Sequence, residues 1–318
     1  MSKERISCTK CGRKAVYRRR YSGEALCGSC FSESIVEKTK RTISQYRMLK
    51  YGDKVALGVS GGKDSLSLLH ILSKISEPYG TKIYAVTVDE GIDGYREEAV
   101  ANAQEFASKL GVEQVTLSFK DLYGFKLDES LERRNGKRIA SCTICGTLRR
   151  RALDIGAKKV RANVVATAHN LDDALQTFMI NLLSGDVERI KWLGPGNEPK
   201  AIFGMRRIKP LTEIYEEEIA YYAFLNQIPM QTVSCPHMAE SIRSDIRVIL
   251  NRFEEKHQGM KYSMFNAMMQ IANNLSIETP RDAKPCINCG FPSSGEICSV
   301  CKLLETASPM HLFQIERK

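Results

Sequence analysis

Short apolar runs alternate with amphipathic stretches through the middle of this chain. The runs have the length of buried strands, and the stretches between them repeat apolar residues with the period of a helix. Strands that alternate with helices in this way pack as a parallel sheet with helices on both faces. The pattern therefore predicts an α/β fold built on a doubly wound parallel sheet. The predicted strands lie at residues 55–59, 82–88, 112–119 and 163–168, and the predicted helices at residues 65–72, 95–110 and 142–156.

The pattern changes on both sides of this region. A basic helix is predicted at residues 32–50, before the first strand, and a long polar loop at residues 120–140. After Gly185 the apolar period becomes mainly helical, with one short extended segment. We expect this part to be a helical extension of the same domain. The extended segment lies at residues 208–211, and the later helices at residues 216–225, 241–255 and 260–273.

The first predicted strand runs directly into the sequence Ser-Gly-Gly-Lys-Asp-Ser, residues 60–65. Gly61 and Gly62 allow backbone N–H groups to approach an anion, and the helix that follows adds the positive end of its dipole. Lys63 and two hydroxyl groups supply further donors at the same place. The glycine spacing differs from that of a Walker loop. The segment predicts a phosphate-binding loop, and the alternative is a glycine-rich turn without a ligand.

Three predicted strands end in polar loops that carry functional groups. These loops lie at residues 60–65, 89–95 and 169–173. Because the carboxyl ends of parallel strands meet at one edge of a sheet, ligands bind there in open α/β folds. We therefore expect the three loops to form one site.

The chain has 318 residues, a formal net charge of +10 and 43% hydrophobic residues, which is typical of a globular protein. It shows no apolar run of membrane-spanning length and no signal peptide, so we expect a cytoplasmic protein without a membrane partner. Residues 1–50 hold thirteen Lys and Arg against four Asp and Glu, and residues 120–161 hold twelve against five. The second block includes Arg133, Arg134, Lys137, Arg138 and residues 149–151. Such blocks favour a polyanionic partner such as RNA, although solvated surface charge would give the same pattern.

Eight of the eleven cysteines form two sets of paired Cys-x-x-Cys motifs. Two such pairs place four thiolates around one ion, which suits a closed tetrahedral Zn²⁺ site. We therefore predict two structural zinc modules, at residues 1–31 and 280–318, around a catalytic domain at residues 32–275. Unligated or disulfide-bonded cysteines are the alternative. The first set is Cys8, Cys11, Cys27 and Cys30, and the second is Cys286, Cys289, Cys298 and Cys301. Basic residues of the first module, which are available to bind phosphates, are Arg13, Lys14, Arg18, Arg19 and Arg20.

Three cysteines remain, namely Cys142, Cys145 and Cys235. Three thiolates leave one coordination position open, as in an iron–sulfur cluster with one iron that the protein does not hold. A second possibility is a sulfur-carrying pair that cycles through persulfide and disulfide, with Cys235 as one member. A third is that all three are inert, packed thiols. The spacing alone does not choose among these possibilities.

Several motifs together give the chain a family resemblance. The loop at residues 60–65 resembles the PP-loop of ATP pyrophosphatases, which split ATP between its α and β phosphates. The combination with Cys142-x-x-Cys145 and with Ala166-Thr-Ala-His-Asn-Leu-Asp-Asp173 resembles the TtcA/TtuA branch of tRNA thiolation enzymes. The segment at residues 88–96, Ser141-Cys-Thr-Ile-Cys-Gly146 and the terminal cysteine pairs are most similar to the cytoplasmic tRNA 2-thiolation family of archaea and eukaryotes.

The resemblance implies a set of nucleotide contacts. Lys63 would neutralise the departing pyrophosphate, Asp64 would either orient the loop or lie near a Mg²⁺ ion, and Val88 would contact adenine. Asp173 would take part in catalysis, with Asp172 and His169 beside it. The full set implied to bind ATP is Val59, Ser60, Gly61, Gly62, Lys63, Asp64, Ser65, Val88, Ala166, His169 and Asp173.

The resemblance also implies a sulfur-transfer step. Cys142, Cys145 and Cys235 match the ligands of a [4Fe-4S] cluster with one open iron, and Cys142 and Cys235 are implied to be catalytic with Lys63, Asp64 and Asp173. Arg149 stands where a close relative has a lysine, and a guanidinium cannot serve as a general base. The implied reaction is adenylation of a tRNA uridine at C2, at the wobble position, followed by attack of sulfur.

The implied partners are tRNA and a sulfur donor, either sulfide or a thiocarboxylated ubiquitin-like protein, and we expect a homodimer. Three other functions remain open from the residues alone. The enzyme could thiolate a T-loop uridine or an anticodon-loop cytidine, or form an amide without a sulfur step. Alternatively, the chain could be a non-catalytic zinc-ribbon subunit that binds tRNA.

Overall fold

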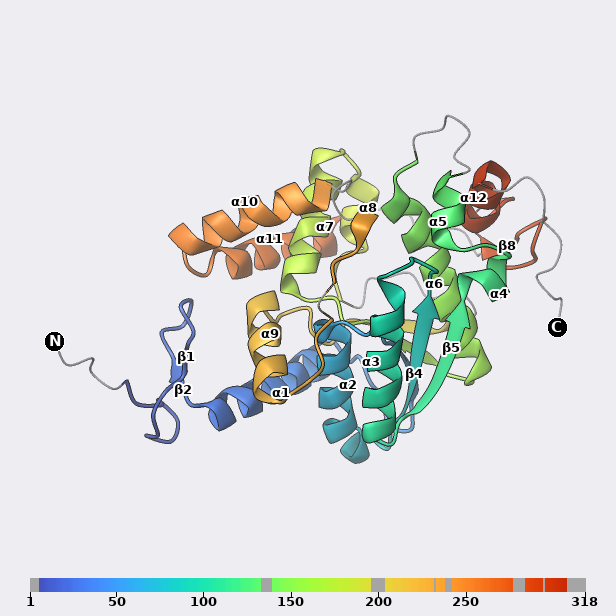
Figure 1. The fold of residues 1–318 in the computed structure, drawn as a ribbon. Coiled ribbons are helices and arrows are strands. Elements are labelled where there is room, and N and C mark those ends of the chain that lie inside the picture. Colours follow the sequence, from blue (N-terminus) through green and yellow to red (C-terminus); the bar gives the residue numbers. More distant parts are fainter. Residues whose placement is uncertain are drawn as a thin grey trace.

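The computed structural model describes residues 6–132, 139–195, 204–231, 233–237, 242–276, 284–293 and 295–307 (Figure 1). A five-stranded sheet with the order β5-β4-β3-β6-β7 lies at its centre, and all neighbouring strands run parallel. This confirms the predicted doubly wound fold. The sheet consists of β3 (Lys54–Gly58), β4 (Lys82–Asp89), β5 (Glu113–Ser118), β6 (Val164–Ala166) and β7 (Arg206–Ile208).

Helices cover both faces of the sheet, and the alternation of side chains along β3 shows why. Val55 and Leu57 point into the core cluster that contains α2, α3, α1 and α9. Ala56, between them, packs on the opposite face against α6. Helix α6 approaches β4 so closely that a Cβ on Gly156 would lie 2.4 Å from Cγ1 of Val86. These helices are α1 (Gly28–Gln45), α2 (Lys63–Ile75), α3 (Arg96–Lys109), α6 (Ser141–Lys159) and α9 (Glu216–Leu225).

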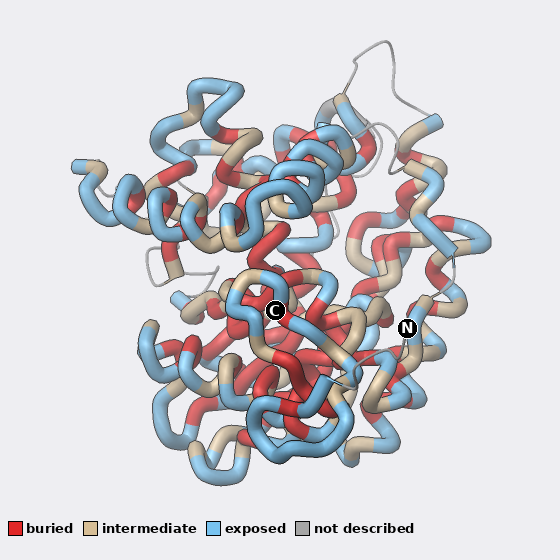
Figure 2. The backbone as a smooth tube through the Cα atoms, turned by 90° about the vertical axis from the view of Figure 1, so that its left-hand side faces the viewer, coloured by how far each residue is buried: buried red, intermediate tan, exposed pale blue. Residues whose placement is uncertain are grey.

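A second group of helices lies above the carboxyl edge of the sheet in Figure 1. Leu171, Leu175, Phe178, Leu250 and Phe265 belong to its separate apolar core. Figure 2 shows that buried residues are concentrated at the middle of the molecule, whereas α10, on the outside of this group, is largely exposed. The group comprises α7 (Leu171–Leu183), α8 (Val187–Lys191), α10 (Ile242–Lys256) and α11 (Met260–Asn274).

The cysteine-rich ends form small hairpins that pack on different sides of the domain. The N-terminal hairpin is joined to α1, and Cys8, Cys27 and Cys30 share the core of α1, α2 and the sheet. The C-terminal hairpin and α12 pack against α6 instead. The hairpins are β1 (Tyr17–Arg18) with β2 (Ala25–Leu26), and β8 (Lys284–Pro285) with β9 (Pro292–Ser293), followed by α12 (Ser299–Ala307).

Some predicted boundaries differ from the structure. Helix α2 begins at Lys63 rather than Ser65, and α1 begins four residues earlier than predicted and ends at Gln45. The described part of the predicted loop at 120–140 contains α4 (Phe119–Tyr123) and α5 (Leu127–Glu132). Apolar residues such as Leu127 explain this, because they pack against Phe119 and Phe125. A short 3-10 helix, η1 (Glu77–Tyr79), lies between α2 and β4.

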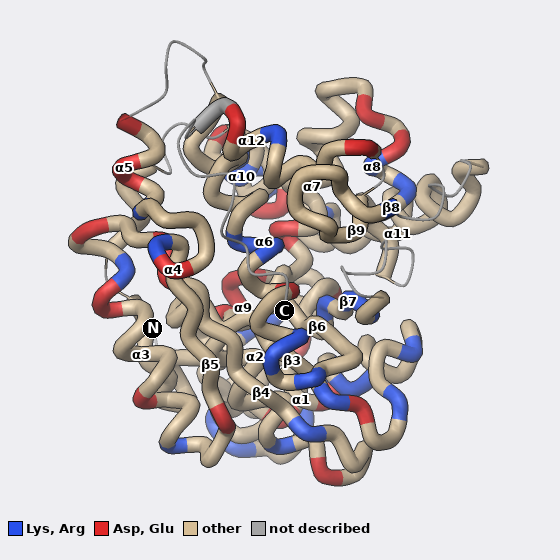
Figure 3. Tube along the Cα trace, turned by 90° about the vertical axis from the view of Figure 1, so that its right-hand side faces the viewer, with Lys and Arg blue, Asp and Glu red and all other residues tan. Residues whose placement is uncertain are grey.

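The basic blocks are only partly described. Arg133, Arg134, Lys137 and Arg138 lie outside the described residues. Figure 3 shows Lys and Arg on several elements of one side of the molecule, α6 and α8 among them. Every helix in the described ranges is too short or too polar to span a lipid bilayer.

Candidate functional site

A cavity of about 290 Å³ lies at the carboxyl edge of the sheet, where the three polar loops meet. The loop after β3 contributes Ser60, Asp64 and Ser65 to its wall. The end of β4 contributes Val88 and Glu90, and the loop after β6 contributes residues 167–169 and Asp173. The expected convergence of the three loops is therefore present.

Hydrogen bonds within the loop after β3 fix its shape. The hydroxyl of Ser65 accepts from the backbone N–H of Ser60 at 3.1 Å and lies 3.1 Å from the Ser60 hydroxyl. Gly61 has a φ of +87°, and a Cβ there would lie 1.9 Å from the backbone oxygen of Ala99 in α3. Gly61 is therefore required by the packing of the loop against α3 as well as by its conformation.

Asp64 and Asp173 bring two carboxyl groups to the cavity. Burial raises the pKa of Asp64, and this effect exceeds the opposing attraction of Lys63. Burial also raises the pKa of Asp173. Asp173 is held by a capping box, in which its side chain accepts from the N–H of Asn170 and its own N–H donates to the Asn170 side chain. Burial makes it costly for these two carboxyl groups to carry a negative charge, and a cation bound between them would offset that cost.

The arrangement of Asp64 fits a hard metal ion. Its Oδ2 accepts from Lys63, whereas its Oδ1 is buried and has no hydrogen-bond partner among the described residues. A buried carboxylate oxygen without a partner is costly, and a divalent cation with oxygen ligands would satisfy it. Asp64 thus has the donor chemistry expected of a Mg²⁺ ligand.

Lys63 does not line this cavity. Its Nζ lies 2.9 Å from Asp64 Oδ2 and 2.9 Å from Glu216 Oε1, so it points toward the start of α9. The ammonium group must turn from Glu216 to reach phosphates in the cavity. Ala166 also lies outside the wall, because it is fully buried in β6, and its neighbours Thr167 and Ala168 line the cavity instead.

Glu90 joins the cavity to the cysteine group. Its carboxylate is 2% exposed and pairs with Arg149 at 2.5 Å and with Arg96 at 2.6 Å. Arg149 also lies on the cavity wall, and its Nη2 donates to Cys145 Sγ at 3.1 Å. The charge of Glu90 raises the pKa of Arg149, which keeps the guanidinium positive. A single cation therefore faces both the cavity and a thiol.

The three remaining cysteines lie in one region near the start of α6, although their sulfurs do not all lie within 4.8 Å of one another. Cys142 and Cys145 lie on its first turns, and Cys235 packs against the same apolar cluster as Cys145. Cys142 Sγ lies 4.0 Å from the carbonyl oxygen of His237, two residues beyond Cys235. Burial is the main cause of the raised pKa of Cys145 and of Cys235. Each pKa is raised further by a neighbouring thiolate, Cys235 in the first case and Cys142 in the second.

The two other cysteine sets form compact groups. In each, the four sulfurs lie within 4.8 Å of one another, close enough to share one ion. Backbone N–H groups donate to several sulfurs, for example that of Cys298 to Cys286 Sγ at 3.3 Å. Such bonds stabilise thiolates, and those from Cys27, Cys11 and Lys10 help to lower the pKa of Cys8 to about 6. Both groups have the donor chemistry of a closed Zn²⁺ site.

One expectation from the sequence is wrong, and two residues of the site were not predicted. Arg19 is only 6% exposed and is bound by Glu218 at 2.6 Å, so it is not available to bind phosphates. Glu90, on the cavity wall, and Glu216, which binds Lys63, were not predicted as residues of the site. The position of Glu90 directly after the second predicted strand could have identified it as a residue of the site. Nothing in the sequence indicated Glu216.

Comparison with known proteins agrees with the family resemblance seen in the sequence over most of the chain. A family model described as a PP-loop domain matches residues 32–252. A second, described as the N-terminal LIM domain of 2-thiouridine synthetase TtuA, matches residues 7–32.

Individual relatives match almost end to end. The tRNA 2-thiolation protein NcsA of Haloferax volcanii is 32% identical, over 95% of this chain and 99% of its own. Cytoplasmic tRNA 2-thiolation protein 1 of Drosophila yakuba is 33% identical, over 94% and 88%. Among solved structures, the U34-tRNA thiolase NcsA of Methanococcus maripaludis, described with its [4Fe-4S] cluster, has a TM-score of 0.82 and 32% identity, over 94% and 96%. This chain belongs to the TtuA-like, cytoplasmic tRNA 2-thiolation family of PP-loop proteins.

Proposed function

We propose that this protein is a tRNA 2-thiouridine synthetase that activates a uridine with ATP and then replaces its C2 oxygen by sulfur. The observation that carries the proposal is Arg149, which faces the nucleotide cavity and also donates to Cys145. Nucleotide activation and sulfur delivery therefore have adjoining places in one fold. The relatives, named as tRNA 2-thiolation proteins, support the same substrate.

The first step is adenylation. The C2 oxygen of uracil attacks the α phosphorus of ATP, the bond to the β phosphate breaks, and pyrophosphate leaves with the proton of N3 released to solvent. The loop at residues 60–65 supplies hydroxyl and backbone donors, and Lys63 supplies positive charge. Asp64 and Asp173 would hold Mg²⁺, whose positive charge would stabilise the negative charge on the phosphates.

The second step is displacement of AMP. Hydrosulfide attacks C2, the bond between C2 and the adenylated oxygen breaks, and 2-thiouridine and AMP form without any change of oxidation state. Arg149 stabilises the negative charge that develops on the departing AMP. Cys142, Cys145 and Cys235 would hold a [4Fe-4S] cluster, which supplies an iron that binds sulfur beside the nucleotide.

The cysteine sets at the two ends would each hold a structural Zn²⁺ ion. Both hairpins have few apolar residues of their own, so a bound metal would supply much of their folding free energy. The division into modules at residues 1–31, 32–275 and 280–318 remains our proposal.

The position modified is the wobble uridine in this proposal. The solved relative is described as a U34-tRNA thiolase, and an anticodon loop is already single-stranded, which lowers the cost of presenting a base to a buried site. The sulfur donor, either sulfide or a thiocarboxylated ubiquitin-like protein, remains a proposal, as do a homodimer and a cytoplasmic location.

Replacing Lys63 with alanine is expected to reduce pyrophosphate release about a hundredfold or more, because a cation near the departing phosphate is lost. Pyrophosphate formed from ATP in the presence of unmodified tRNA is the measurement. Lys74→Ala, on the exposed last turn of the same helix, is the matched control and is expected to behave as wild type. Pyrophosphate release by Lys63→Ala at the wild-type rate would contradict the proposed phosphate loop.

A further inference from the structure

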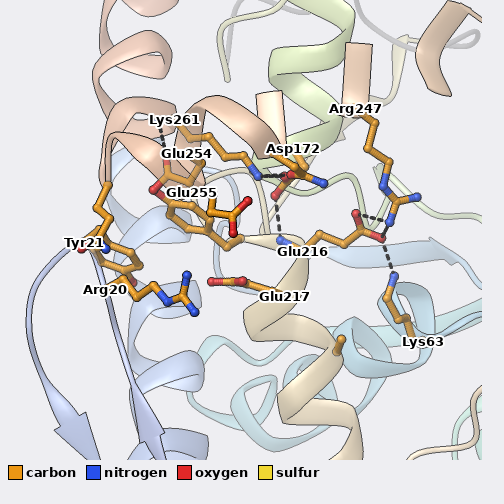
Figure 4. A pocket seen from close by; sticks show the side chains of 14 residues that line it. Arg20, Tyr21, Lys63, Asp172, Glu216, Glu217, Arg247, Glu254, Glu255 and Lys261 are labelled. Carbon is orange, nitrogen blue, oxygen red and sulfur yellow. Dashed lines mark hydrogen bonds and ion pairs between the residues drawn. The ribbon is translucent and has the colours of Figure 1, made fainter. Parts of the chain in front are cut away.

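A second cavity, of about 430 Å³, lies on the other side of Lys63 from the nucleotide cavity. Its wall combines the N-terminal hairpin, the start of α9 and the helices α10 and α11 (Figure 4). Lys63 and Glu216 meet at one end of it, and Arg247 reaches Glu216 from α10. Neither of these two contacts was expected from the sequence.

Glu216 is fixed firmly in this position. One guanidinium nitrogen of Arg247 lies 2.8 Å from each oxygen of the Glu216 carboxylate. The backbone N–H of Glu216 donates to Asp172 Oδ2 at 2.8 Å, and Asp172 is itself paired with buried Lys261. Burial raises the pKa of Glu216, but attraction by Lys63 and Arg247 outweighs it and lowers the pKa overall. Glu216 is thus a charged carboxylate that cannot easily move toward or away from Lys63.

Lys63 has two possible sets of anions. On one side are the phosphates of ATP, which the proposed function places in the cavity beside Asp64. On the other side is Glu216, 2.9 Å from its ammonium group, which Asp64 also contacts at 2.9 Å. The long, flexible lysine side chain can reach either, but one ammonium group cannot serve both fully. The attraction of Lys63 to Glu216 therefore weakens the binding of phosphate to Lys63.

We propose that Glu216 is a positioning residue that competes with ATP phosphates for Lys63, and that Arg247 weakens this competition by binding the same carboxylate. This inference rests on the proposed function, because it assumes that phosphates bind at residues 60–65. Arg247 also keeps Glu216 neutralised after Lys63 has turned away. The pair therefore sets the affinity of the enzyme for ATP without contacting the nucleotide.

The competition predicts effects of opposite sign for its two members. In Glu216→Gln the charged competitor is gone, Lys63 keeps only its pair with Asp64 beside the phosphate site, and ATP should bind about threefold more tightly. In Arg247→Gln the Glu216 carboxylate loses one of its two ion-pair partners and attracts Lys63 more strongly, and ATP should bind about threefold more weakly. These factors correspond to a partly exposed ion pair, with side chains 26% and 20% exposed, whose free energy is screened by water. A purely structural role for Glu216 would predict weaker binding instead.

A general change of charge must be separated from this specific competition. Glu217 lines the same cavity but contacts Tyr17, and not Lys63, so Glu217→Gln makes the same change of charge as a matched control. The double variant Glu216→Gln with Arg247→Gln gives a second test. If Arg247 acts through Glu216, its replacement should have no effect once Glu216 is glutamine, whereas a general charge effect would be additive.

The experiment is calorimetric titration of the four variants and the wild type with ATP and Mg²⁺, and separately with adenosine. We expect the opposite shifts for ATP, no shift for adenosine, wild-type affinity for Glu217→Gln, and melting temperatures close to wild type. Equal shifts in Glu216→Gln and Glu217→Gln, or weaker ATP binding in Glu216→Gln, would overturn the inference. Absence of ATP binding by the wild-type protein would instead contradict the proposed function.

Discussion

Replacing Cys235 with serine is expected to abolish 2-thiouridine formation while tRNA binding remains near the wild-type level. A serine hydroxyl stays protonated at neutral pH and is a poor ligand for iron, so a cluster held by three thiolates is lost. Cys235 packs in an apolar cluster with residues of α6 that includes no residue of the loop at 60–65, so we expect its replacement to leave that loop unchanged. Mass spectrometry of tRNA nucleosides measures the product, and a tRNA binding assay is the control.

The same experiment on Cys142 and Cys145 separates the two interpretations of these residues. A cluster requires all three thiolates, so each single serine variant should lose the product and the iron–sulfur absorption together. A persulfide pair would require Cys235 and only one member of the Cys142-x-x-Cys145 motif. Normal 2-thiouridine from any one of the three variants would therefore contradict the cluster, and an inactive variant with intact absorption would favour a different role.

Replacing Gly61 with alanine is expected to destabilise the protein by about 3 kcal/mol and to remove ATP binding. The added Cβ would lie 1.9 Å from the Ala99 oxygen, and that oxygen belongs to the backbone of α3, which cannot yield cheaply. The positive φ of +87° adds strain for any residue with a Cβ. Thermal unfolding and calorimetric titration with ATP are the two measurements.

Gly62 provides the matched control for this change. A Cβ there would meet only the Ser60 hydroxyl, at 3.7 Å, and the backbone is extended with a φ of −87°. Gly62→Ala should therefore unfold at nearly the wild-type temperature, whatever it does to ATP binding. Equal melting temperatures for the Gly61 and Gly62 variants would show that the close approach to α3 does not shape the loop.

Four of the five strands were predictable because each is a short apolar run that ends in a polar loop, whereas β7 is Arg-Arg-Ile and overlaps the expected extended segment only at Ile208. The site followed from that arrangement, because parallel strands bring residues 60–65 and Asp173 to the same edge. The proximity of Cys235 to Cys145 could be predicted only from the family resemblance, because ninety residues separate them and no local pattern joins them. Sequence periodicity describes neighbours along one element and says little about contacts between distant ones.

The ion pairs around the site were the part that the sequence could not predict. Arg19 and Arg149 are equally basic in the sequence, yet one is buried against Glu218 and the other faces the cavity. Glu216, Glu217 and Glu218 are consecutive glutamates with three different surroundings. Charge in a sequence does not indicate a partner, because the partner is chosen by the packing of helices such as α9 and α10.

The most direct test of the account is one reaction with anaerobically purified protein, unmodified tRNA, ATP and sulfide. Nucleoside mass spectrometry and phosphate analysis then measure 2-thiouridine, AMP and pyrophosphate in the same sample. The account predicts equal amounts of all three, with the sulfur at the wobble uridine. Pyrophosphate and AMP formed without any 2-thiouridine, or 2-thiouridine formed without ATP, would contradict the claim that activation and sulfur transfer belong to one site.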